Sequence, residues 1–458
     1  MKLFALVVIC IVSSGLHEAV HAQVSCAGPR AVSESIQRTG GQLRVTLIYS
    51  VITGVSPLAE ARRLHGQLMP QVELVDAPLL SKSPRSRLSL SLTQHDDVKR
   101  FPNRTLEYLD LKGRGLSSKD KQTISNAHRV LAVVVDIPQK DFAKNFDLAN
   151  RYVADLARTT NAYLSDDSTR EFFSPSSWTE ARLGEPSDLL SVSRHVTIHA
   201  FQSGDYLRAV SVGMSKLGLP DITVAELSAA EAKPVGDLIN ALSQRIFENP
   251  LEVRSGATSL QIAALKPTTA RRNLNQSLQA GSSAAASLCL YHTEPQQGDD
   301  DNRQLEIGFD RAPGTDRHAK RHALLVDMFG AVPSAILGAR SGDKELAEAS
   351  RRAREKIPRL KQEFNAGLRA GDRLLVKAPF RADDGSKEFM WVEIVRWSAS
   401  GELRGLLSSD PRSIRSLRAG QEVTVVELDV YDYLRTYADG RTEGNETGRI
   451  LQQRSGAK

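Results

Sequence analysis

The sequence predicts an α+β protein: two mixed α/β units, followed by a domain that joins a helix to a small, barrel-like antiparallel meander. Strand patterns alternate with amphipathic helix patterns over residues 43–309. A long helical stripe and four alternating strands then follow one another over residues 343–428. The chain has 458 residues, of which 41% are hydrophobic and 25% charged, enough for about three globular domains.

The N-terminus has the pattern of a cleavable signal peptide over residues 1–22. Lys2 supplies a positive charge, residues 3–12 are apolar, and Val20 and Ala22 are the small residues of a cleavage site after Ala22. A buried N-terminal strand or helix is the alternative. No later stretch approaches 18 consecutive apolar residues, so we expect a secreted or periplasmic protein with no membrane span.

Cysteine content fits this compartment. The chain has three cysteines, and cleavage after Ala22 removes Cys10. In an oxidising compartment Cys26 and Cys289 are then a candidate disulfide, with two unpaired thiols as the alternative. Sequence does not give the Cα separation that would decide between them.

The first unit is expected over residues 23–175. Residues 128–136 form a continuous apolar run, typical of a strand covered on both faces. Residues 141–159 carry apolar side chains at helical spacing, and a hairpin with an Asp-Asp-Ser turn follows at 162–173. Further elements are a strand at 43–49, a helix at 57–69 and a strand at 87–92.

The second unit is expected over residues 190–310, after a linker at 174–192. A helix at 234–247 begins near a proline and carries leucines on one face. The expected strands lie at 195–201, 206–213, 222–227, 284–291 and 304–309. The alternation of elements suggests that the two units are diverged copies of one fold. A helical connector is expected over 311–340.

The third domain is expected over residues 341–440, before a disordered tail at 441–458. Pro358 is expected to kink or split its helix at 343–369. Short turns join the strands that follow, and the predicted strands are 374–380, 387–397, 402–407 and 422–428.

A series of residues in this third domain resembles the pattern of a known family. The series is Asp372–Phe380, Glu388–Glu393, Gly405 with Asp410-Pro411, Leu417–Gly420 and Val423. In order and spacing it resembles the YegJ-like bacterial domain of unknown function over roughly residues 340–437. The chain has Asp432-Tyr433 where that family often has Asp-Trp. The resemblance implies a bacterial source, and it brings no known activity, cofactor or catalytic residue.

Charge is weakly basic overall and concentrated in two stretches. The chain has 60 Lys and Arg against 54 Asp and Glu, a formal net charge of +6, too small to imply a dedicated nucleic-acid binder. Residues 80–130 hold eleven basic against five acidic side chains, and residues 340–361 hold eight against four. Such basic stretches usually form helix faces and loops that are exposed to solvent. The alternative is that they contact an acidic envelope polymer or anionic head groups.

No set of residues in the sequence forms a recognisable catalytic or metal centre. His195 and His199 lie roughly 13 Å apart on a strand and cannot share one ion. His318 and His322 are helical neighbours, but the central residues of H-E-x-x-H are missing between them. Gly213–Gly218 reads G-x-S-x-x-G and fits a packing turn better than a nucleophile elbow. We therefore expect no cofactor, metal or catalytic residue.

One candidate binding surface lies on the meander. Exposed aromatic and basic side chains there would suit a peptide or a glycan. The alternative is that the aromatic residues fill a small barrel core. The candidate residues are Lys377, Phe380, Arg381, Trp391, Arg396 and Trp397.

Secretion without a catalytic set favours a non-enzymatic envelope or secreted binding protein, whose partner is a protein or an envelope polymer. One alternative is an envelope-directed hydrolase whose site is assembled only in the fold. An immunity or antagonist protein is another. We expect no specific nucleic-acid partner.

Overall fold

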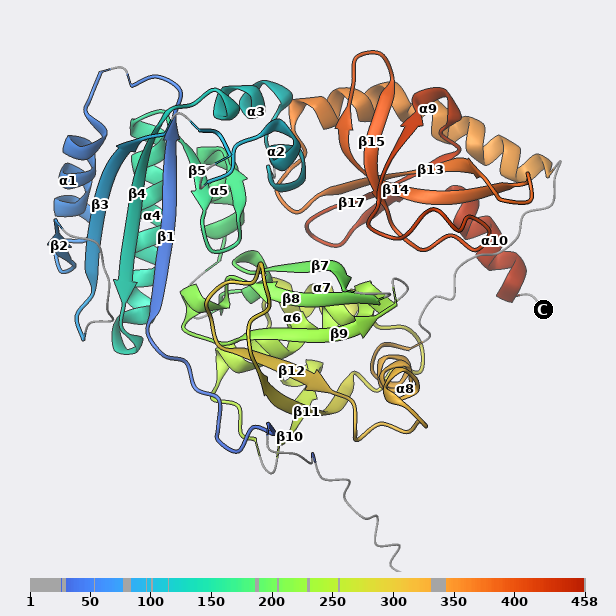
Figure 1. Ribbon diagram of the computed structural model, residues 1–458, viewed down its shortest axis with the longest axis horizontal. Coiled ribbons are helices and arrows are strands. Elements are labelled where there is room, and N and C mark those ends of the chain that lie inside the picture. The colour runs from blue at the N-terminus through green and yellow to red at the C-terminus, as the bar shows by residue number, and fades with distance from the viewer. Residues whose placement is uncertain are drawn as a thin grey trace, which may run out of the picture.

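The computed structural model describes Cys26 and residues 30–456, with gaps at 53, 77–83, 96, 100–101, 114, 186–188, 204–205, 229–230, 254–255 and 331–342. The expected signal peptide at 1–22 lies outside the described residues. The described residues form three six-stranded sheets flanked by helices, none closed into a barrel (Figure 1). The predicted α+β class is confirmed, whereas the barrel-like expectation for the third domain is wrong.

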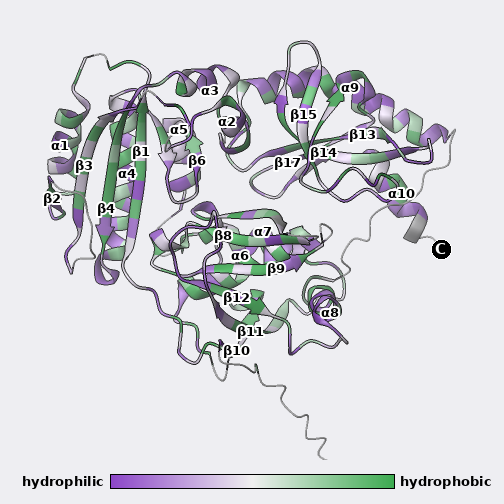
Figure 2. Ribbon diagram, in the orientation of Figure 1, coloured by the Kyte–Doolittle hydropathy of each residue, from purple (hydrophilic) through white to green (hydrophobic). Residues whose placement is uncertain are grey.

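The first sheet has the order β2-β3-β4-β1-β5-β6. It pairs β1 with β4 along its full length, because both strands carry β-branched residues that are buried on both faces. Figure 2 shows hydrophobic residues concentrated on these central strands. The strands are β1 (Gly41–Tyr49), β2 (Glu73–Val75), β3 (Arg87–Gln94), β4 (Arg129–Ile137), β5 (Tyr163–Asp166) and β6 (Glu171–Phe173).

Helices around this sheet bury one apolar stripe each. The longest, α4 (Phe142–Thr159), buries Phe142, Phe146 and Val153 against the sheet and α1. The expected linker at 174–192 contains α5, which begins at a proline after a Ser174 capping box. The other helices are α1 (Pro57–Leu68), α2 (Leu106–Lys112), α3 (Ser118–Ser125) and α5 (Pro175–Arg182).

The second sheet has the order β10-β11-β12-β9-β8-β7, and its two antiparallel halves meet at a parallel pair, β9 with β12. The central pair of the first sheet, β1 with β4, is antiparallel, so the two units differ in strand direction at this point. The strands are β7 (Thr197–Ser203), β8 (Tyr206–Val212), β9 (Asp221–Leu227), β10 (Ala257–Gln261), β11 (Ala285–Thr293) and β12 (Gln304–Gly308). The helices are α6 (Ala232–Glu248), α7 (Thr269–Ser277) and α8 (Arg317–Phe329), the last within the expected connector.

An N-terminal arm connects the first unit to the second. It runs from β1 down to the far side of the second unit (Figure 1), where Ala31 bridges Tyr291 and Ile36 bridges Leu251. Cys26 and Cys289 form a disulfide in the structure, with their Cα atoms 5.5 Å apart. The arm thus belongs by contact to the second unit.

The first two units share one hydrophobic core. A single cluster of buried side chains extends from Val45 on β1 to Ile307 on β12. The short helix η4 (Met214–Leu217) lies at the junction and packs on β1. The Gly213–Gly218 motif is therefore a packing turn between units.

The third sheet has the order β16-β15-β14-β13-β17-β18, with α9 (Lys344–Ala366) packed on one face. Pro358 lies inside α9, which the structure shows as a single helix. The tail expected to be disordered instead contains β18 and α10, which packs on α9. The elements are β13 (Arg373–Arg381), β14 (Lys387–Trp397), β15 (Glu402–Leu407), β16 (Glu422–Val426), β17 (Asp432–Thr436), β18 (Thr442–Gly444) and α10 (Glu446–Gly456).

In the part of the chain that the structure describes, no helix combines the length and the apolar character that a membrane crossing requires.

Candidate functional site

Two neighbouring cavities lie where the β5–β6 turn of the first unit faces the second unit. The first, the sheet cavity, has a volume of about 230 Å³ and is walled by β7, β8 and the loop between β11 and β12. The second, the turn cavity, has a volume of about 410 Å³ and is walled by the β5–β6 turn and by Lys99, Pro102, Asn103 and Tyr108. Both are lined by Arg170 and Asp300. Together they form what we call the inter-unit cleft.

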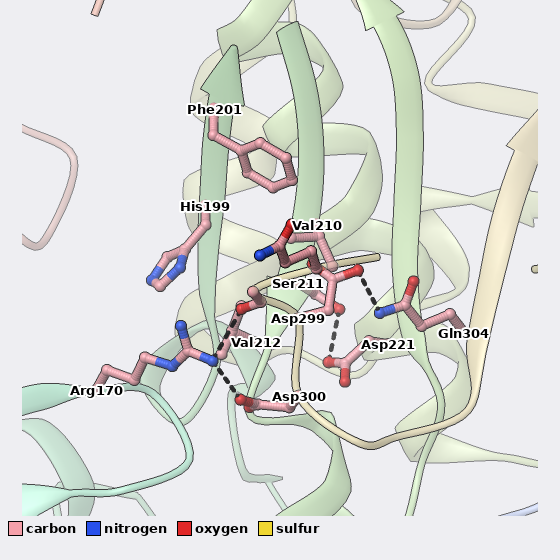
Figure 3. A pocket seen from close by; sticks show the side chains of 12 residues that line it. Arg170, His199, Phe201, Val210, Ser211, Val212, Asp221, Asp299, Asp300 and Gln304 are labelled. Atoms are coloured by element: carbon pink, nitrogen blue, oxygen red, sulfur yellow. Dashed lines mark hydrogen bonds and ion pairs between the residues drawn. The ribbon is translucent and has the colours of Figure 1, made fainter. Parts of the chain in front are cut away.

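Arg170 connects the two walls of the cleft. Its Nη2 donates to the Gly298 carbonyl oxygen at 3.0 Å and to Asp300 Oδ1 at 2.6 Å (Figure 3). Arg170 has φ of +59°, a conformation that costs a non-glycine residue free energy and that often occurs at functional sites. The backbone N–H of Arg170 donates to the Asp166 carbonyl, so the tight turn itself aims the guanidinium across the cleft.

Polar groups deep in the sheet cavity bond mainly to one another. Asp221 accepts hydrogen bonds from Ser211 Oγ, the Met214 backbone N–H and Asn302 Nδ2. Burial nevertheless raises the pKa of Asp221 to about 7. Asp299 accepts from Gln304 and Arg208, and although burial opposes it, Arg208 holds the pKa of Asp299 below its usual range. These bonds order the β11–β12 loop.

The turn cavity contains polar groups with spare hydrogen-bonding capacity. Tyr108 packs edge-on against Phe172, and its hydroxyl has no hydrogen-bond partner among the described residues. Asn103 uses its side-chain oxygen to accept from the Thr105 N–H and keeps its amide donors. Lys99 is exposed at the rim. The arrangement can donate several hydrogen bonds to one ligand group.

Asp167 lines the same cavity as a carboxyl group that favours its neutral form. Burial raises its pKa to about 8, against hydrogen bonds from Thr46 and Ser165 that favour the charged form. The negative charge of neighbouring Asp166 raises the pKa further. At neutral pH Asp167 therefore adds less negative charge to the cavity than an ordinary aspartate would.

A buried ion cluster supports the turn from behind. Lys216 of η4 and Asp166 of β5 are both fully buried, with Nζ 2.5 Å from Asp166 Oδ2. Arg182 of α5 contacts the same oxygen at 3.0 Å and Glu171 at 3.1 Å. Burial lowers the pKa of Lys216 to about 8, against the attraction of Asp166. Residues of both units thus fix the turn that carries Asp167 and Arg170.

The structure separates the six residues predicted to form a surface on the meander. Trp397 is 3% exposed and donates from Nε1 to Glu427, because a bulge between Ile394 and Arg396 turns it toward the core. Phe380 is half-buried against the same core. These two aromatic residues therefore belong to the core of the third unit and not to an exposed surface.

Of the remaining four, Lys377 and Trp391 are partners across the β13–β14 pair, and Arg381 and Arg396 lie further along these strands. Arg396 forms an ion pair with Asp110 of the first unit, at 2.5 Å. Lys377 lies 5.8 Å from the Trp391 ring centre, and burial lowers the pKa of Lys377. Arg381 is exposed at the end of β13. The structure thus does not gather the six residues on one exposed surface.

The histidine pairs form no metal site in the described residues, where no group of three or more His, Cys, Asp or Glu side chains is placed to hold an ion. His195 is buried against Phe146, and burial lowers its pKa well below the usual value. His199 lines the sheet cavity and contacts Lys112 of the first unit at 2.9 Å. His318 stacks on Tyr206 at the surface.

Of the two basic stretches, the second is described over residues 343–361, where several basic side chains pair with acidic partners. Arg352 pairs with Glu446 at 2.8 Å and Lys361 with Glu427 at 2.9 Å. In the stretch 80–130, Arg104 is buried and donates to main-chain carbonyls, whereas Lys99 stands at the mouth of the turn cavity. Among the described residues, Lys99 is therefore a basic side chain that a ligand in the cleft could contact.

Sequence reasoning missed Asp167, Arg170 and Asp300 as site residues. The sequence around Asp167 predicts a turn, and the polar sequence around Asp300 predicts an exposed loop, so neither pattern indicates a binding site. The ion pair between Arg170 and Asp300 spans 130 positions in the sequence. The local signal was a run of acidic residues in each of two turns, Asp166-Asp167 and Asp299–Asp301.

Residues 343–457 match a family described as "Uncharacterized protein conserved in bacteria (DUF2314)". The match covers the third unit and supports a bacterial domain of unknown function, but not the YegJ-like name that the resemblance predicted. No curated protein and no solved structure matches the chain.

Proposed function

We propose that this chain is a secreted or periplasmic binding protein that holds a polar segment of an envelope polymer in the inter-unit cleft. The observation that carries the proposal is the Arg170 bridge, which is shared by two cavities with walls from separate units. Clefts between units are preferred places for ligand sites. The bridge holds the two walls at a fixed separation and leaves polar groups directed into the cavities.

Two further features support a location outside the cytoplasm. Residues 1–22 contain the positive charge of Lys2, an apolar run and a small-residue cleavage pattern. The Cys26–Cys289 disulfide is of a kind that persists in oxidising compartments.

The proposal is tested by equilibrium dialysis of the mature chain against soluble fragments of digested envelope polymers, with mass spectrometry of what is retained. We expect one class of fragment to be retained, and Arg170→Ala to weaken its binding at least tenfold. Arg158→Ala is the matched control, because Arg158 forms an exposed ion pair on α4. Retention of no fragment, or equal retention by Arg170→Ala, contradicts the proposal.

A hydrolase is the second candidate, because Asp167 and Asp221 line the cleft with pKa values raised to about 8 and about 7. Such carboxyl groups are suited to act as general acids at neutral pH. The same dialysis detects this activity: fragments would shorten with time, and Asp167→Asn would stop the shortening. Fragments recovered intact support binding alone.

A further inference from the structure

Donors outnumber acceptors in the turn cavity. Both hydrogen bonds of Arg170 use Nη2, so Nε and Nη1 have no partner among the described residues. The Tyr108 hydroxyl lies within electrostatic reach of both Arg170 and Asp300. The Asn103 amide adds two further N–H groups. A ligand group with several acceptor atoms would satisfy these donors.

The charged groups of the cavity leave one positive charge uncompensated. Lys99 and Arg170 are positive, and Asp300 is negative and paired with Arg170. Burial raises the pKa of Asp167 to about 8, with a further contribution from Asp166, so the neutral form of its carboxyl group is favoured. The balance suits one negative charge, and the Asp300 carboxylate at the wall repels a ligand group with two.

Resting on the proposed function, we propose that the turn cavity binds a carboxylate group of the polymer segment, held by Arg170, Tyr108, Asn103 and Lys99. Hydrogen bonds from charged or polarised donors to a carboxylate are stronger than those to a neutral hydroxyl. The carboxylate is that of an acidic sugar or of a peptide end, and the probes below distinguish these two sources.

Isothermal titration calorimetry at pH 7 with matched probes tests the proposal. Glucose, glucuronate and glucose 6-phosphate differ in the substituent on C5, which is a hydroxymethyl group, a carboxylate or a phosphorylated hydroxymethyl group. N-acetylalanine represents a peptide end. We expect glucuronate or N-acetylalanine to bind at least tenfold more tightly than glucose and glucose 6-phosphate, and the tighter of the two identifies the source.

Two variants locate the binding. Tyr108→Phe keeps the ring against Phe172 and removes one donor, so we expect the tighter carboxylate to bind about tenfold more weakly. Tyr206→Phe is the matched control on a surface tyrosine outside both cavities. Asp300→Asn removes the repelling charge, so we expect tighter carboxylate binding. A misfolded variant would not produce this gain.

The proposal is overturned if neither glucuronate nor N-acetylalanine binds more tightly than glucose, or if glucose 6-phosphate binds more tightly than both carboxylates. A carboxylate affinity that Asp300→Asn fails to raise also overturns it. The two proposals can be distinguished. If the chain retains envelope fragments through neutral groups, the proposed function is supported and the carboxylate assignment is wrong.

Discussion

Two adjacent aspartates show how position alone sets the charge of a side chain. Asp166 is fully buried, yet Lys216 and Arg182 overcome the effect of burial and hold its pKa below the usual value. Asp167 lines the turn cavity, accepts hydrogen bonds from the hydroxyls of Thr46 and Ser165, and has its pKa raised to about 8 by burial. The Asp166 carboxylate therefore forms a buried ion pair with Lys216 of the second unit. In the cleft, the raised pKa of Asp167 favours its neutral form.

The raised pKa of Asp167 makes stability depend on pH. Below the usual pKa of 3.8 the carboxyl is protonated in both folded and unfolded chains, and its favourable contribution is complete. That contribution falls as pH rises from about 4 through about 8, because only the unfolded chain ionises freely. We expect Asp167→Asn to match the native chain in urea unfolding at pH 4 and to exceed its stability at pH 8.

The control for this comparison is Asp155→Asn, which replaces a partly exposed carboxylate on α4. It should show no gain that grows with pH. Equal stabilities of Asp167→Asn and the native chain at both pH values would show that Asp167 ionises normally.

Among the elements, η4 decides how the first two units fit together. Its residues Met214, Lys216 and Leu217 are buried, and glycines with positive φ stand at both ends, Gly213 and Gly218. A Cβ atom on Gly218 would collide with the backbone of Thr39 in the N-terminal arm. A glycine is required at 218 for both conformation and space.

This requirement is tested by Gly218→Ala. We expect a loss of unfolding free energy well above the ~1–2 kcal/mol that a left-handed conformation costs an L-residue. Gly420→Ala is the matched control, because Gly420 has φ of +77° against +73° for Gly218 and has open space where a Cβ would stand. Equal losses in thermal and urea unfolding would exclude the collision with Thr39.

At the scale of the whole molecule, the N-terminal arm and its disulfide hold the first two units around the cleft. The bonded cysteines are 263 positions apart, and the arm adds backbone hydrogen bonds such as Val32 N–H to the Leu290 carbonyl. The third unit touches both others through Arg396 with Asp110 and Gln276 with the Asp439 carbonyl. The arm therefore connects the first unit, through β1, to the second unit, and these two units form the cleft.

Removing the disulfide should destabilise the chain. A closed loop of this length contributes up to ~5 kcal/mol in the chain-entropy model. We expect Cys26→Ser/Cys289→Ser to unfold at lower urea than the native chain under non-reducing conditions, and the native chain with reductant to match the variant. Coincident curves for native and variant chains without reductant would show that the arm is held by its other contacts.

The sequence by itself determined the α+β class and most strands and long helices, because apolar periodicity is a local property. It left out short elements such as α2 and β18, which depend on tertiary contacts, and it treated the tail as disordered although α10 packs there on α9. The meander strands were predictable, but the bulge that turns Trp397 inward was not.

Only the tertiary structure decided the candidate site. The cleft depends on bringing the β5–β6 turn to a loop 130 residues away, where Arg170 meets Asp300. Protonation there depends on burial and neighbouring charge, as the contrast between Asp166 and Asp167 shows. The local pattern of apolar and polar residues determines which segments form strands and turns. The hydrophobic core shared by the first two units and the Arg170–Asp300 ion pair determine which turn and loop face each other.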